Sequence, residues 1–178
     1  PVYAIQVLGA PAWLTGVLYA IYTALLAVAQ TSLVRLLESH RRTRALMLGA
    51  LLWVGSFIFL AAAPLLPREA IVAYLSAVTV LYTVAVMVHA GVIDALVVEA
   101  APNTLRGRYV AVFNLSWAAA NAFAPGLFTV MLAWYTGLPW ILLAVLLLLA
   151  LVGVRHAEPR LAGQAVRMGS DHASGMLP

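Results

Sequence analysis

The sequence predicts an all-α integral membrane protein that crosses a bilayer about five times. Hydrophobic residues make up 65% of its 178 residues and charged residues only 9%, whereas a soluble domain carries roughly 25% charged residues. The apolar residues also form long runs, which crossing ~30 Å of hydrocarbon as a helix requires. Lipid cannot satisfy backbone amides, and the alternating pattern of a β-barrel is absent, so helix is the expected state of each run.

Five apolar runs are long enough, or nearly long enough, to be transmembrane helices. The third exceeds the thickness of a bilayer, so we expect it to tilt or protrude, and the fifth is short. Residues 157–178 are polar and contain Gly, Ser and Pro, which indicates a disordered tail. The predicted spans are 13–34, 45–66, 70–98, 109–134 and 138–154, and together with their connections they form one membrane domain, residues 1–156.

The arginines predict the orientation of the spans. The chain has no Lys, and nine of its ten Arg residues fall on one side of a five-span arrangement, while Arg68 falls on the other beside Glu69. The positive-inside rule places the side with nine, and with it the C-terminus, in the cytoplasm. Arg used to the exclusion of Lys is also typical of GC-rich bacteria, so we expect the bacterial cytoplasmic membrane. The nine are Arg35, Arg41, Arg42, Arg44, Arg106, Arg108, Arg155, Arg160 and Arg167.

Composition and motifs argue against several other functions. The formal charge of +4 does not indicate a nucleic-acid partner, because the arginines lie between apolar runs. The chain has no Cys, and no metal-ligand spacing, phosphate-binding glycine loop or nucleophile elbow is present. We therefore expect neither an enzyme nor a protein with a bound metal or cofactor.

Polar side chains divide the spans into two kinds. The second and fifth spans are apolar and are expected to lie outside, facing lipid, while the third lies between the first and the fourth. The other three carry polar side chains at steps of three or four residues, on one face of a helix. Such stripes either hydrogen-bond between packed helices or line a transport pathway. The pathway candidates are Tyr19 and Tyr22 in the first span, Thr79, Tyr82 and His89 in the third, and Asn114, Trp117 and Asn121 in the fourth.

Ionisable residues near the cytoplasmic side are candidates for a proton site or a gate. Asp94 lies about four residues from the end of the third span, where it either binds a proton or is a solvated carboxylate paired with Arg106 or Arg108. His89 lies deeper and is either a proton carrier or a neutral hydrogen-bonding group. Arg106 and Arg108 otherwise set the topology and bind anionic headgroups.

Two further motifs concern the backbone. Pro125 and Gly126 should kink the fourth span, because proline removes an amide donor and clashes one turn back, and the pair serves either as a hinge or for packing. Ala45 and Gly49 have the small-xxx-small spacing of a close helix contact, for which we favour a structural role.

These features together resemble the eighth to twelfth helices of a twelve-helix transporter of the major facilitator superfamily. Segment 35–44 resembles the Arg-rich loop of the second half, although the Asp-Arg and Gly of that signature are missing. Segment 101–109 resembles the loop before the eleventh helix of drug-efflux-like members, and 121–126 the Pro-Gly kink of that helix. Pro1–Tyr3 and Leu8–Gly9 resemble the outer end of the seventh helix and the loop after it.

The resemblance implies a C-terminal fragment of a secondary active transporter. Its partners would be the lipid bilayer, the missing N-terminal half and a small organic or amphipathic solute, moved with proton coupling and in the manner of efflux proteins. The alternative is a five-helix membrane scaffold or partner subunit that transports nothing. Upstream coding sequence separates these, because about seven more apolar spans in frame support the transporter.

Reporter fusions test the predicted orientation. A reporter that is active only in the cytoplasm should be active when fused after His156 and inactive when inserted at Pro67. The reason is that His156 lies on the side that holds nine of the ten arginines. The opposite pattern would show that the orientation is inverted.

Overall fold

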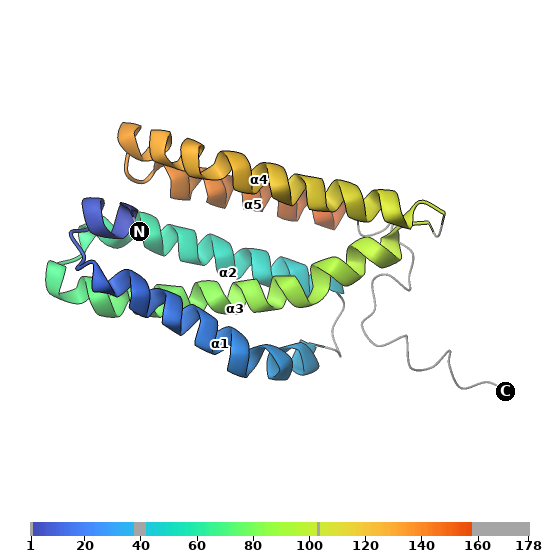
Figure 1. Cartoon of the computed structure of the whole chain (residues 1–178), viewed down its shortest axis with the longest axis horizontal. Helices are drawn as coiled ribbons and strands as arrows, with labels where there is room; N and C mark the ends of the chain where they lie inside the picture. The colour runs from blue at the N-terminus through green and yellow to red at the C-terminus, as the bar shows by residue number, and fades with distance from the viewer. Residues whose placement is uncertain (1, 38–41, 103, 158–178) are drawn as a thin grey trace.

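The chain forms a bundle of five long helices in a computed structural model that describes residues 2–37, 42–102 and 104–157. All regular structure in these residues is helical, and five of the helices are long and apolar enough to cross a membrane, which confirms the predicted fold class. Figure 1 shows that successive helices run in opposite directions. The elements are η1 (Tyr3–Val7), α1 (Trp13–Leu37), α2 (Arg42–Ala62), η2 (Ala63–Leu65), α3 (Arg68–Ala100), α4 (Arg106–Trp134) and α5 (Leu138–Ala157).

The predicted spans and the helices coincide closely. Four expected ranges lie wholly within α1, α3, α4 and α5, and the range 45–66 covers most of α2, all of η2 and one residue beyond. Ala157, where the disordered tail was expected to begin, belongs to α5, and residues 158–178 lie outside the described part of the chain. The two ends of the bundle differ in charge. We call them the η1 end and the arginine end, the latter holding Arg44, Arg106, Arg108 and Arg155.

Prolines and charges lie at several of the helix ends. Leu66 is extended (φ −90°, ψ 152°) because the residue before a proline avoids the helical region. Pro67 in turn precedes α3, whose first turn contains Glu69, and a negative charge stabilises a helix N-terminus. At the other end of the chain, Arg155 and His156 lie in the last turn of α5, where positive charge is favourable.

The order of the helices differs from the expectation in one respect. α3 contacts α1, as predicted, but its other main neighbour is α2, which also packs against α5. α4 makes few contacts, mainly with α3 and α5. The prediction that the second span lies outside is therefore wrong, while the fourth does adjoin the third, though only sparsely. An apolar surface is equally compatible with lipid and with another helix, so hydrophobicity alone does not separate the two.

Small residues bring α2 close to α3. Ala45 is 2% exposed. A Cβ built on Gly49 would lie 3.4 Å from the Ala85 carbonyl oxygen, from the His89 amide nitrogen and from Val88 Cγ1. The small-xxx-small pair therefore lies at a close helix crossing, as the sequence predicts.

Two tyrosine hydroxyls hold the end of α2 at the η1 end. Tyr3 donates a hydrogen bond to the Leu60 carbonyl, and Tyr74 donates one of 2.8 Å to the Phe59 carbonyl. The residue four positions after Leu60 is Pro64, which has no amide N–H to offer. Because burial raises the pKa of Tyr3 to about 12, its hydroxyl stays protonated and supplies the missing donor.

Substitution of Gly49 tests the close crossing of α2 and α3. Gly49→Leu should destabilise the bundle by about 1–3 kcal/mol, because the larger side chain meets backbone atoms of α3. Gly55→Leu is the matched control, since a Cβ built on Gly55 meets no atom within 4 Å. Thermal unfolding in detergent, followed by circular dichroism, measures both, and equal midpoints would refute the close crossing.

Candidate functional site: the polar stripe of α4

α4 contacts the rest of the bundle near its two ends and exposes its middle. Met131 is buried and residues such as Phe113 and Phe128 are half-buried, but every residue from 114 to 127 is exposed. We call Asn114, Trp117 and Asn121 the α4 stripe. Half-buried residues precede and follow the stripe in the sequence at steps of three or four positions. This spacing places them and the stripe on the same face of α4. This series is Val110, Asn114, Trp117, Asn121, Pro125, Phe128 and Leu132.

The α4 stripe therefore faces the same side as the points where α4 meets the bundle. Within it, Asn121 Nδ2 donates a hydrogen bond of 2.9 Å to the Trp117 carbonyl. Pro125 offers no N–H, so the Asn121 carbonyl loses its usual helical donor. The helix nevertheless runs unbroken through Pro125 and Gly126 (Figure 1). Their role as a hinge stays a prediction.

The candidates in α1 lie partly against α3. Tyr19 is 69% exposed and Tyr22 is half-buried, with their ring centroids 6.3 Å apart. Both belong to α1, which packs against α3. The Thr23 hydroxyl donates to the Tyr19 carbonyl at 3.0 Å, so that polar group is satisfied within its own helix.

Two of the three candidates in α3, Tyr82 and His89, face α2 rather than the α4 stripe. The His89 ring lies 4.8 Å from that of Trp53, measured between centroids, and the Tyr82 ring lies 6.2 Å from Trp53 and 6.4 Å from Phe57. Thr79 is half-buried, and its carbonyl accepts a hydrogen bond of 2.6 Å from the Thr83 hydroxyl. Tyr82 and His89 therefore contact α2, the helix that the sequence analysis predicted to lie on the outside of the bundle and face lipid.

Ring contacts extend this arrangement to η1, α4 and α5. Trp140, at the start of α5, lies 4.9 Å from Tyr3, 5.0 Å from Phe128 and 6.2 Å from Phe57 between ring centroids. We call the connected rings of Tyr3, Trp53, Phe57, Tyr82, His89, Phe128 and Trp140 the aromatic network. Sequence reasoning missed its members in α2 and α5, although the four-residue spacing of Trp53 and Phe57 on one helix face was a usable signal.

The ionisable candidates lie toward the arginine end. The backbone of Asp94 and Glu99 belongs to α3, and their side chains lie outside the described part of the structure. Arg106 and Arg108 are exposed in the first turn of α4. A pair between Asp94 and either arginine stays a prediction.

These observations define a multi-pass, all-helical membrane protein with a polar stripe on a sparsely packed helix. Among the described residues, no group of three or more His, Cys, Asp or Glu side chains could hold a metal ion. No protein-family model, curated protein or solved structure matches the chain. Its function has to be argued from its own residues.

Labelling of introduced cysteines tests whether the α4 stripe is accessible to water. The chain has no Cys of its own, so Asn121→Cys and the opposite-face control Phe123→Cys can be compared without background. A thiol in water ionises and one in hydrocarbon does not, so a water-borne maleimide should label the first roughly tenfold faster or more. Equal rates in intact membranes would mean that the stripe does not face water.

Proposed function

We propose that the chain is the C-terminal part of a secondary active transporter of the major facilitator type. It moves a small organic or amphipathic solute with proton coupling, in the manner of efflux proteins, in the bacterial cytoplasmic membrane with the C-terminus inside. The observation that carries the proposal is the α4 stripe, which places two amides and an indole in the exposed middle of a membrane-spanning helix. Polar groups in hydrocarbon are expensive, so their natural neighbours are water, solute or another helix.

The distribution of exposure supports a missing partner bundle. α1 packs mainly on α3, and α4 makes few contacts with the rest, although both carry polar or aromatic stripes. Transporters of this kind place the solute between two helical halves, so a second bundle would face both helices. The missing N-terminal half is the partner that the proposal requires.

The chemistry of the stripes indicates the kind of solute. Between residues 13 and 33 of α1, and between 109 and 134 of α4, there is no charged side chain. Recognition there rests on amide hydrogen bonds and on the faces of Tyr19, Tyr22 and Trp117, which suit an organic molecule with apolar rings and few polar groups. Proton coupling then depends on a group elsewhere. Asp94 is our first candidate and His89 the second.

Transport by the intact protein that contains this chain tests the proposal. Cells or vesicles that carry it should extrude a fluorescent amphipathic dye when a proton gradient is present. Asn121→Leu should slow transport roughly 3- to 10-fold, because one hydrogen bond to the solute or its water is lost. Phe123→Leu, on the opposite face of α4, is the matched control. If neither the intact protein nor a panel of dyes shows gradient-dependent movement, the scaffold alternative is favoured.

Coupling is tested by the two carboxylates of α3. Asp94→Asn should reduce proton-driven transport more than Glu99→Gln at equal expression, because Asp94 lies further inside the span and a partly dehydrated carboxylate changes its protonation more readily. Counterflow of solute without a gradient should survive in Asp94→Asn. If both variants transport like the wild type, Asp94 has no part in coupling.

A further inference from the structure

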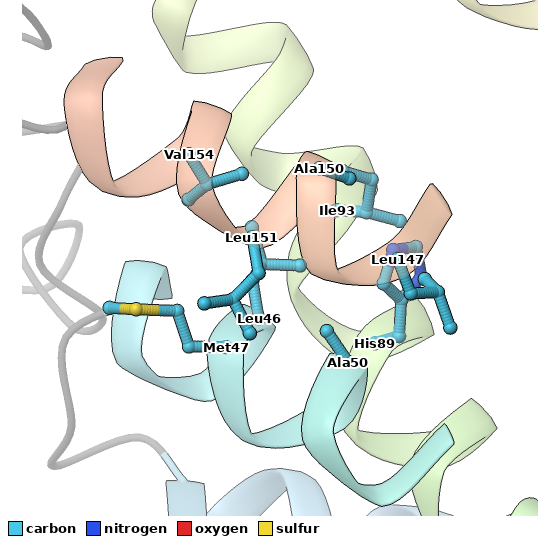
Figure 2. Close-up of a pocket in the computed structure, with 9 residues that line it drawn as sticks. All are labelled: Leu46, Met47, Ala50, His89, Ile93, Leu147, Ala150, Leu151 and Val154. Carbon is cyan, nitrogen blue, oxygen red and sulfur yellow. The ribbon is translucent and has the colours of Figure 1, made fainter. Parts of the chain in front are cut away.

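A second site lies away from the α4 stripe, between α2, α3 and α5. It is a cavity of about 100 Å³ in the half of the bundle toward the arginine end (Figure 2). Eight of its nine lining side chains are apolar and the ninth is His89. We call it the α5 slot, and its lining is Leu46, Met47 and Ala50 of α2, His89 and Ile93 of α3, and Leu147, Ala150, Leu151 and Val154 of α5.

The α5 slot is elongated along the helices. Its α5 residues span from Leu147 to Val154, which is about 10 Å at the rise of an α-helix. Figure 2 shows Val154 and Met47 toward one end and His89 toward the other. Because the helices cross the membrane, the slot runs in the same direction as the acyl chains of the surrounding lipid.

The lining favours hydrocarbon over water. A buried water typically needs two to four polar partners, and His89 is the one polar side chain of the lining, with its ring against Trp53. The small side chains of Ala50 in α2 and Ala150 in α5 leave room for the slot. Ala150 is exposed, so the slot opens on the outside of the bundle. In a membrane this opening faces lipid.

Two arginines lie close to the end of the slot nearest the arginine end of the bundle, which we call its mouth. Arg44 precedes the lining residue Met47 by three positions, and Arg155 follows Leu151 by four, so each lies on the same helix face as part of the lining. Both arginines are exposed. Long cationic side chains at helix ends reach the headgroup region, where they attract anionic lipid.

We propose that the α5 slot binds one acyl chain of an anionic phospholipid, whose phosphate is held by Arg44 and Arg155. The juxtaposition of an apolar slot parallel to the lipid chains with two cations at its mouth carries this assignment. Hydrocarbon fills the slot, and the charge complementarity selects the headgroup. The site does not depend on whether the chain transports a solute.

The headgroup part of the proposal is tested by native mass spectrometry of the whole chain in detergent. Phosphatidylglycerol and phosphatidylcholine with the same acyl chains are added in turn. The wild type should retain the former preferentially, and Arg44→Gln with Arg155→Gln should weaken its binding by about fivefold per arginine. Arg68→Gln, which removes an exposed arginine at the η1 end of the bundle, far from the slot, should leave binding within about twofold.

The acyl-chain part is tested on α5. Ala150→Trp fills the slot and should abolish tight phosphatidylglycerol binding, while Leu149→Trp, at an exposed neighbouring position outside the lining, should not. Circular dichroism checks the fold of each variant, and Ala150→Leu replaces the tryptophan variant if that one unfolds. Inorganic phosphate at millimolar concentration should not displace the lipid, which separates a lipid site from a phosphate site. Equal loss in Arg68→Gln, unchanged binding in the filled slot, or displacement by phosphate would each overturn the proposal.

Discussion

The contacts of Trp140 are the interaction on which the arrangement of the other elements depends. This one side chain meets η1 through Tyr3, α2 through Phe57 and α4 through Phe128. The contacts with Tyr3 and Phe128 are edge-to-face, with interplanar angles of 70° and 77°, and aromatic pairs of this kind contribute about 0.5–1.5 kcal/mol beyond their buried area. Because α4 makes so few other contacts, Phe128 is one of the main points that fix its position.

Close packing is important in this bundle because lipid, rather than water, surrounds the helices. Lipid tails are as apolar as leucine, so burying Leu or Val between helices gives little net gain, and close packing has to supply the association energy. The molecule uses two devices for this purpose. Gly49 lets the backbones of α2 and α3 approach, and the aromatic rings fill the wider spaces between η1, α2, α4 and α5. The apolar helix α2 thereby becomes central.

Much of the fold could be predicted because the bilayer restricts length and composition. Runs of apolar residues and the prolines at Pro67 and Pro102 place the helices and their ends, since these depend on local chemistry. The central place of the apolar helix α2 could not be predicted, because the same apolar surface suits lipid and protein. In the candidate site, too, some features could be predicted from the sequence and others could not. The spacing of Asn114, Trp117 and Asn121 placed them on one face of α4, whereas Tyr82 turned out to contact Trp53 and Phe57, which nothing in its own helix indicates.

The hydrogen bond from Tyr3 to Leu60 also bears on the order in which the chain assembles. The donor enters the membrane system first, its acceptor belongs to the second span, and the ring of Trp140 that packs on Tyr3 arrives with the fifth. At ordinary rates of protein synthesis, on the order of ten seconds separate the first of these residues from the last. Tyr3 can reach the Leu60 carbonyl, which Pro64 cannot serve, as soon as the second span is in place, but Trp140 covers the Tyr3 ring only later. The packing around Tyr3 at the η1 end is thus completed only when the last of the five helices has been made.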